Sequence, residues 1–290
     1  SLGLVGSEMC IRDSASAAIL AKEILKTMGI NIPVITTLHG TDITLVGKDP
    51  SCKPVINHSI NLSDKVSAVS QSLKDDTEKI FDIKNKIDVI PNFIDLKKYT
   101  SVKKNNYRSK FCDQGDKLLI HTSNFRKVKR IQDVINVFCK IRKKKRCKLI
   151  MIGDGPERAN IESLTRTLCS LSDVIFIGKV PDVENVLFKA DLFLLPSEKE
   201  SFGLSALEAM ASSVPVVSSN AGGLPELIEN AKSGYICKIG DVEDMSKKSL
   251  DILDDKNLKI FKDNALKRAK NYDIEKILPE YIKMYKGVLK

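Results

Sequence analysis

Short apolar runs alternate with amphipathic helical patterns along most of this chain of 290 residues, and that alternation constrains the fold more than any other feature. Strand-length apolar runs separated by helical patterns are typical of parallel α/β units. Two such series occur, and a polar, lysine-rich and weakly periodic stretch at 96–116 separates them. The alternation therefore predicts an α/β protein with two Rossmann-like domains that face a cleft.

The first series contains three apolar runs of strand length and the helical patterns around them. Its predicted strands are 33–38, 66–69 and 87–90, and its predicted helices are 15–28, 54–62 and 72–81. The second series is longer and predicts a complete doubly wound domain. Its predicted strands are 118–122, 148–152, 174–177, 191–195 and 214–218, and its predicted helices are 130–144, 156–171, 183–189 and 205–211.

The domain limits follow from the two series. We expect a partial N-terminal domain at 15–95, a linker at 96–116, a C-terminal domain at 117–272, and at 273–290 an amphipathic helix that packs back toward the first domain. Residues 1–14 show neither helix nor strand period and resemble a translated cloning adapter, so the fold prediction omits them. Because the natural chain would then begin inside a helix without a preceding strand, we expect the N-terminal domain to be truncated.

The composition, with 42% hydrophobic and 29% charged residues, is typical of a globular protein. No apolar run approaches the roughly 20 residues that span a bilayer, and no signal-peptide pattern is present, which predicts a cytoplasmic location. The net charge is +10, but the densest basic run, 142–146, lacks interleaved aromatic residues and ends a predicted helix facing solvent. We expect an anionic small substrate, no nucleic acid and no membrane association, and homo-oligomerisation stays open.

The seven cysteines are scattered and odd in number, form no C-x-x-C pair, and do not cluster with the three histidines, His39, His58 and His121. Neither a disulfide framework nor a metal site is predicted. We expect reduced cysteines, with Cys139 and Cys147 as small core residues, and we expect no cofactor and no metal.

Two carboxylates eight residues apart, Glu200 and Glu208, flank a turn that opens a helix. The apolar segment at 191–196 is typical of a buried strand that ends at a proline, so Glu200 follows the strand's carboxyl end, where open α/β sheets bind ligands. The helix is expected to begin near Leu204 or Ser205, where its first N–H groups attract a phosphate. The arrangement suits a phosphorylated sugar, although glutamates at this spacing are also common as solvated charges.

A basic loop at 123–130 follows another predicted strand. Arg126 offers fork-like contacts and Lys129 a point charge, a combination that suits a diphosphate. Basic loops are often only solvated, but this loop is predicted to leave the sheet at the same edge as Glu200, which favours phosphate binding.

Glycine turns follow further strands of the second series. Gly153 begins a Gly-Asp-Gly-Pro turn that resembles a nucleotide-cradling turn but lacks the Gly-Lys-Ser/Thr ending of a P-loop, so packing and binding explain it equally well. Another glycine turn lies at 221–226. In the first series, His39 precedes Gly40 at a strand's carboxyl end, and it is either structural or able to reach a substrate.

These motifs jointly resemble those of the retaining glycosyltransferases of the large GT4 family. The resemblance extends from Ala15 almost to the C-terminus, and the carboxylate pair matches the family's E-x7-E motif. It rests on His39-Gly-Thr-Asp42, Ser70, the glycine turns at 153–157 and 222–226, and the pair Glu200 and Glu208. It implies the GT-B fold, with an acceptor-side N-terminal domain and a donor-binding C-terminal domain.

The resemblance also implies roles for single residues. Glu200 would bind the donor sugar, Arg126 and Lys129 would neutralise the pyrophosphate, and His39 would contact the sugar at its reacting face. The family's basic pair is usually Arg-x4-Lys, whereas Asn124 stands at the arginine position here. Glu208 would hold the ribose hydroxyls. The remaining residues expected on the nucleotide-sugar are Ser201, Phe202, Gly203, Leu204, Asn124 and Gly153.

Within the family, the motifs at 39–44, 123–130 and 196–204 resemble those of bacillithiol-pathway members. This implies transfer of N-acetylglucosamine from UDP-GlcNAc to the hydroxyl of L-malate, with retention and without a metal. The departing phosphate would take the acceptor's proton, so positioning and charge stabilisation would be the protein's contribution. Two alternatives stay open: a lipid or polysaccharide acceptor, which the basic surface favours, and an inactive nucleotide-sugar-binding fragment.

Overall fold

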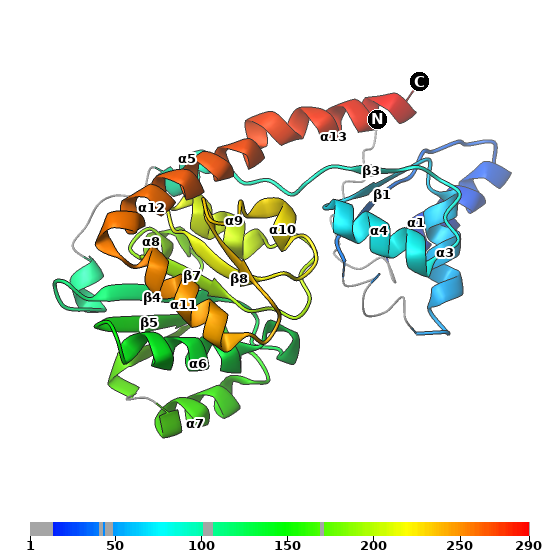
Figure 1. The fold of residues 1–290 in the computed structure, drawn as a ribbon. Helices are drawn as coiled ribbons and strands as arrows, with labels where there is room; N and C mark the ends of the chain where they lie inside the picture. The colour runs from blue at the N-terminus through cyan, green and yellow to red at the C-terminus, as the bar shows by residue number, and fades with distance from the viewer. Residues whose placement is uncertain (1–13, 41–42, 44–48, 101–106, 169–170, 290) are drawn as a thin grey trace. The chain divides into compact units, whose positions relative to one another are not determined.

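The computed structural model describes residues 14–40, 43, 49–100, 107–168 and 171–289. They form two compact units, one within 1–92 together with 275–290 and the other within 93–274 (Figure 1). Each unit is built around its own parallel sheet. Apart from Ser14, which begins the first helix, the adapter-like segment lies outside the described residues. None of the described helices is long and apolar enough to cross a membrane.

The first unit has a three-stranded parallel sheet in the order β1-β2-β3. Its elements are β1 Ile35–Leu38, β2 Lys65–Ala68, β3 Ile87–Val89, α1 Ser14–Thr27, α3 Lys53–Leu62, α4 Gln71–Ile80 and most of α13 Ile274–Val288. Ser70 caps α4, since its hydroxyl accepts a hydrogen bond from the Leu73 N–H at 3.1 Å. The Tyr281 hydroxyl of α13 donates to the carbonyl of Ile90 at 3.2 Å, which fastens this helix beyond the end of β3.

The second unit has a six-stranded sheet in the order β6-β5-β4-β7-β8-β9, with every neighbouring pair parallel. Its strands are β4 Lys117–Thr122, β5 Cys147–Ile152, β6 Val174–Gly178, β7 Leu192–Leu195, β8 Val216–Ser219 and β9 Gly234–Cys237. Counted along this unit the order is 3-2-1-4-5-6, the order of a Rossmann sheet. All of β7 is buried, as expected for a strand covered by helices on both faces.

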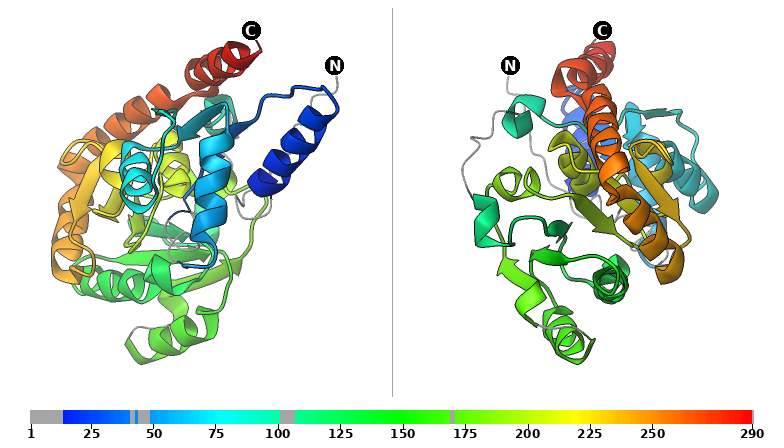
Figure 2. Two further views of the ribbon diagram at one scale, coloured as in Figure 1. Left: turned by 90° about the vertical axis from the view of Figure 1, so that its right-hand side faces the viewer. Right: turned by 60° about the vertical axis from the view of Figure 1, so that its left-hand side comes forward.

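Helices cover both faces of this sheet. One face carries α6 Ile131–Arg142, α7 Arg158–Leu168 and α11 Val242–Ile252, and the other carries α8 Glu184–Leu187, α9 Leu204–Ala211 and α12 Asp255–Ala269. Both views of Figure 2 show α6 beside α11. The helix α6 buries Val134, Phe138 and Ile141 at helical spacing against the sheet. The short elements are α5 Leu96–Thr100, α10 Leu224–Leu227, η2 Tyr107–Lys110, η3 Lys127–Lys129, η4 Leu171–Asp173 and η5 Lys270–Tyr272.

The structure confirms the predicted strands and helices, with ends that differ by a few residues. The stretch 96–116, predicted as a linker, lies within the second unit and contains α5 and η2, while 101–106 lies outside the described residues. One expectation was wrong, because Cys139 is disulfide-bonded rather than reduced. The basic run 142–146 faces solvent as expected, with Arg142, Lys143, Lys144 and Arg146 exposed. Two of its cations also have partners, since Arg142 pairs with Asp173 and the Lys145 ammonium donates to the Leu253 carbonyl at 2.6 Å.

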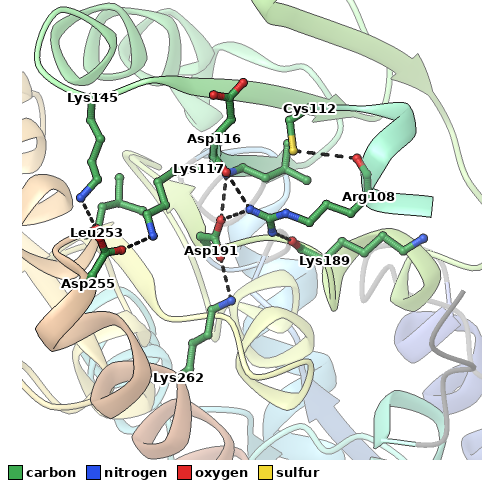
Figure 3. A network of polar contacts seen from close by, with 11 residues as sticks. Arg108, Cys112, Asp116, Lys117, Lys145, Lys189, Asp191, Leu253, Asp255 and Lys262 are labelled. Carbon is green, nitrogen blue, oxygen red and sulfur yellow. Dashed lines mark hydrogen bonds and ion pairs between the residues drawn. The ribbon is translucent and has the colours of Figure 1, made fainter. Parts of the chain in front are cut away.

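A buried carboxylate, Asp191, ties four segments together at the amino end of the second sheet (Figure 3). Its Oδ2 lies 2.5 Å from Arg108 Nη2 and accepts the Leu118 N–H at 2.9 Å, and its Oδ1 lies 2.9 Å from Lys262 Nζ. Burial alone raises the pKa of Asp191, but Lys262, Arg108 and the Leu118 N–H outweigh it and hold this pKa below 3.8. The network thereby fixes η2 and α12 to the starts of β4 and β7.

We predict that Asp191→Asn lowers the free energy of unfolding by about 3 kcal/mol, since it breaks a buried ion pair. Asp255 is the matched control, because it also pairs with a lysine, Lys117 at 2.5 Å, but its side chain is 82% exposed. Asp255→Asn should lower the free energy of unfolding far less than Asp191→Asn, because solvent screens an exposed ion pair. Urea unfolding near neutral pH measures the free energy of unfolding of both variants. Equal losses would contradict the stabilising role of the buried Asp191 network.

The same network predicts a pH dependence. Because the folded-state pKa of Asp191 is depressed, its contribution is present above its unfolded pKa and is lost as the pH falls through the lower folded value. The stability difference between wild type and Asp191→Asn should therefore shrink when unfolding is repeated at a pH of about 3.

Candidate functional site

The second sheet has one point at which its strand order reverses, between β4 and β7. Connections from these two strands run in opposite directions, so the loops that follow them separate, and open α/β sheets bind ligands at such a point. The loop after β4, 123–130, carries Asn124, Arg126 and Lys129, and the loop after β7, 196–203, carries Glu200 and Ser201. The predicted donor-site residues of both loops therefore belong to the same edge of one sheet.

An ion pair joins the two loops. Lys129 Nζ lies 2.6 Å from Glu200 Oε2, and the two side chains are only 19% and 14% exposed. The N–H of Glu198 also donates to the carbonyl of Val128 at 2.7 Å, so the backbones are linked as well. Sequence reasoning placed Lys129 on a phosphate and Glu200 on a sugar, and the structure brings these opposite charges into direct contact. Arg126, in contrast, is exposed at the start of η3.

The glycine turns lie directly against these loops. A Cβ on Gly222 would come within 1.8 Å of the Glu200 carbonyl oxygen, to which the Gly223 N–H donates at 3.0 Å. A Cβ on Gly153 would come within 1.8 Å of the Ser123 carbonyl oxygen. Only glycine allows such close backbone approach. The turns therefore support the loops after β7 and β4, and contact between Gly153 and a donor stays a prediction.

Helix α9 begins at Leu204, as predicted, after Gly203 in the left-handed conformation with a φ of 95°. The Glu208 carboxylate lies one turn inside α9 and accepts a hydrogen bond from the Tyr99 hydroxyl of α5 at 3.1 Å. Burial, reinforced by Glu184, raises the pKa of Glu208, although the Tyr99 hydrogen bond and Lys98 oppose the shift. Phe202 is buried and meets the Tyr272 ring edge-on, with centroids 5.6 Å apart, so only its backbone remains to serve a ligand.

Two residues near the site were missed by sequence reasoning. Tyr99 fell in the predicted linker, where no periodicity marked it. His121 was treated only as a histidine outside any cluster, yet it is fully buried in β4 and bonds both Leu194 and Ser123. A histidine inside the apolar run Leu-Leu-Ile-His-Thr was a usable signal, because a buried polar side chain needs partners.

His39 lies in the first unit, directly after β1. Of the motif that follows it, Thr41, Asp42 and Thr44 lie outside the described residues. No group of three or more His, Cys, Asp or Glu side chains that would hold a metal ion occurs in the described part of the chain. The role of His39 and the metal-free reaction both stay predictions.

Family models match both parts of the chain. The model described as glycosyl transferases group 1 matches residues 102–271, and the model described as glycosyltransferase family 4 matches residues 12–98. The first match covers the Rossmann sheet and all the loops described above. The second covers the three-stranded sheet with His39 and Ser70.

Relatives give the same result. The chain is 40% identical over 282 residues to N-acetyl-alpha-D-glucosaminyl L-malate synthase of Bacillus anthracis, which covers 95% of this chain and 72% of that protein. It is 32% identical over 216 residues to an uncharacterized glycosyltransferase of Methanocaldococcus jannaschii, covering 70% of this chain and 55% of that one.

Solved structures of glycosyltransferases share the fold. The Anabaena protein HepE in complex with UDP superposes with a TM-score of 0.82 at 21% identity, covering 95% of this chain and 77% of that chain. Sucrose-phosphate synthase from Thermosynechococcus elongatus gives a TM-score of 0.82 at 18% identity, covering 94% and 72%. Fold and site thus define a glycosyltransferase enzyme with the GT-B fold. The chain belongs to glycosyltransferase family 4.

We predict that Gly222→Ala lowers the free energy of unfolding by about 3 kcal/mol, the sum of a left-handed backbone penalty and a forced displacement of the Glu200 carbonyl. Gly115 is the matched control, because its φ is also positive, +90° against +50° at Gly222, and a Cβ there would meet nothing within 4 Å. Gly115→Ala should cost only about 1 kcal/mol. Chemical denaturation measures both, and similar losses would show that the Glu200 loop is not held by this contact.

Proposed function

We propose that this protein transfers N-acetylglucosamine from UDP-GlcNAc to the hydroxyl of L-malate, with retention at the anomeric carbon. The observation that carries the proposal is the 40% identity to the Bacillus anthracis L-malate synthase, over an alignment that includes nearly all of this chain. The donor-side geometry supports it independently, because a basic loop, a helix start and two carboxylates gather around one switch point. Each part has a separate task on a nucleotide-sugar.

The diphosphate would occupy the space between the loop after β4 and the start of α9. Lys129 and Arg126 supply positive charge from the loop, and the first N–H groups of α9 supply hydrogen-bond donors together with the helix dipole. Phe202, Gly203 and Leu204 stand at that helix start and Ser201 just before it, while Asn124 lies in the basic loop and Gly153 lies against its first residue, Ser123. Neutralising the diphosphate stabilises the UDP leaving group, which is the main electrostatic demand of the reaction.

The Lys129–Glu200 ion pair suggests how the two residues divide the donor between them. Lys129 Nζ and Glu200 Oε2 lie 2.6 Å apart. A bound diphosphate offers Lys129 a stronger anionic partner, and hydroxyls of the sugar offer Glu200 neutral donors. In this proposal the two groups bind different parts of the donor, Glu200 the sugar and Lys129 the leaving group.

Glu208 would hold the ribose hydroxyls of UDP. Its Oε1 accepts the Tyr99 hydroxyl at 3.1 Å, which orients the carboxylate, and Oε2 would accept a ribose hydroxyl. Burial raises the pKa of Glu208, while the Tyr99 hydrogen bond and the charge of Lys98 favour the ionised carboxylate. Hydrogen bonds to a charged acceptor are the stronger kind, so this contact should contribute substantially to UDP affinity.

For the chemical step, the departing phosphate oxygen would accept the proton of the malate hydroxyl as the new glycosidic bond forms on the same face. His39 would contact the sugar at that face. The protein then contributes orientation and charge stabilisation rather than a side-chain base. The proposal requires no metal ion.

The acceptor is tested by UDP release. We expect the protein to release UDP from UDP-GlcNAc when L-malate is present, and not when succinate, which lacks the hydroxyl, replaces it. UDP release with a lipid-linked or polysaccharide acceptor but not with malate would support the alternative acceptor class. UDP binding without turnover on any acceptor would support a binding-only protein.

The division of roles predicts different losses in two variants. Glu208→Ala should weaken UDP binding roughly 10- to 100-fold, because a hydrogen bond to a charged group is lost. Glu200→Ala should lower the transfer rate by about 100-fold while leaving UDP affinity unchanged or higher, since it frees Lys129 for the phosphates. Calorimetric UDP titrations and initial rates separate the two effects.

Glu198→Ala is the control for both variants. Glu198 belongs to the same loop, is exposed, and contributes its backbone N–H rather than its side chain to the contact with Val128. Glu198→Ala should change neither the UDP affinity nor the transfer rate. Equal losses of UDP affinity in Glu200→Ala and Glu208→Ala would count against separate roles.

A further inference from the structure

A fully buried histidine, His121, connects the two strands that flank the switch point. Its Nδ1 lies 2.8 Å from the carbonyl oxygen of Leu194 in β7, and its Nε2 lies 2.8 Å from the hydroxyl oxygen of Ser123, the first residue after β4. Its exposed fraction is 0%. Both ring nitrogens therefore have partners, one in each of the segments that lead into the donor-site loops.

The backbone ladder cannot make this connection by itself. The register of β4 with β7 pairs Leu119 with Leu192 and Ile120 with Phe193, and it includes no later residues, although β4 continues to Thr122 and β7 to Leu195. The strands thus stop pairing where the site begins. Beyond that point the imidazole of His121, rather than a backbone N–H, hydrogen-bonds the Leu194 carbonyl. Without this bond the carbonyl would be a buried acceptor with no donor, which costs free energy of folding.

The protonation state of the ring follows from its partners. Burial lowers the pKa of His121 to about 4, and Lys129 adds to the shift, so the ring is neutral at physiological pH. A carbonyl only accepts hydrogen bonds, so Nδ1 carries the proton and donates it to Leu194. Nε2 then accepts the Ser123 hydroxyl proton. The link is a directed chain of donors from Ser123 through His121 to Leu194.

We propose that His121 is a positioning residue for transfer: its two hydrogen bonds set the separation of the loops after β4 and β7, and thereby place Lys129 and Glu200 on the donor. Two contacts join the loops next to the His121 hydrogen bonds. They are the backbone hydrogen bond from Glu198 to Val128 and the ion pair of Lys129 with Glu200. Displacements of about 1 Å in such groups are enough to cost about 100-fold in rate.

Packing alone is the competing explanation. The His121 ring lies near Phe193 and Phe125, with centroid distances of 6.3 and 6.4 Å. His121→Phe tests it, because that variant keeps an aromatic ring between these neighbours and removes both hydrogen bonds. His121→Asn is the conservative variant, because its amide nitrogen occupies the place of Nδ1 and retains the donor to Leu194.

The experiment uses the full chain and two readouts. Hydrogen exchange of the Glu198 amide reports the loop-to-loop contact without any ligand, and calorimetry with UDP reports the donor site. We expect His121→Phe to speed Glu198 exchange at least tenfold and to weaken UDP binding roughly 10- to 100-fold, and we expect His121→Asn to recover most of both. Ser123→Ala should produce part of the loss in wild type and none in the His121→Phe background.

Ser249→Ala controls for lost stability, because it removes a fully buried hydrogen bond, 2.6 Å to the Met245 carbonyl in α11, from the same unit. It should lower Tm without changing either readout. The UDP readout rests on the proposed function, and failure of the wild-type protein to bind UDP would refute that proposal while Glu198 exchange still decides the role of His121. Wild-type Glu198 exchange in His121→Phe, or purely additive effects with Ser123→Ala, would overturn the inference.

Discussion

The adjacency of β4 and β7 is the constraint on which the site depends. These strands are distant in sequence but neighbours in the sheet, and their connections leave in opposite directions. Loops that leave adjacent strands in opposite directions separate at the carboxyl edge, and open α/β sheets bind ligands at such a point. The ion pair of Lys129 with Glu200 and the imidazole of His121 both span this one junction. At the amino ends of the same two strands, Asp191 and its cations hold the segments together.

Glycines contribute to the site chiefly through what they allow other residues to do. Gly222 lets the backbone of the next loop support the Glu200 carbonyl, and Gly153 does the same for Ser123. The donor-site loops are therefore held by backbone contacts with the neighbouring glycine turns and by side-chain contacts with each other. This explains how loops outside the strands and main helices can present charged groups at fixed places, which electrostatic stabilisation of a leaving group requires.

Much of this could be predicted from the sequence, because the relevant signals are local. Alternating apolar runs predicted the strands of both sheets, a proline and a glycine marked the turn before α9, and the E-x7-E spacing led to the family that the comparisons show. The signals failed where partners are remote in sequence. Tyr99 approaches Glu208 across 109 positions and His121 approaches Leu194 across 73, and no local period records such pairs. The pairing of Arg142 with Asp173 was missed for the same reason.

By itself, then, the sequence determined the class of each element, the residues at strand ends and the glycosyltransferase family. These depend on periodicity and on short motifs whose chemistry lies within a few neighbouring residues. The tertiary structure decided which charges meet, that Lys129 rests on Glu200 rather than in solvent, and that a neutral histidine joins the strands where their ladder ends. Those outcomes depend on strand order and on burial, because a hydrogen bond or an ion pair gains its worth only when folding brings the partners together and removes water from around them.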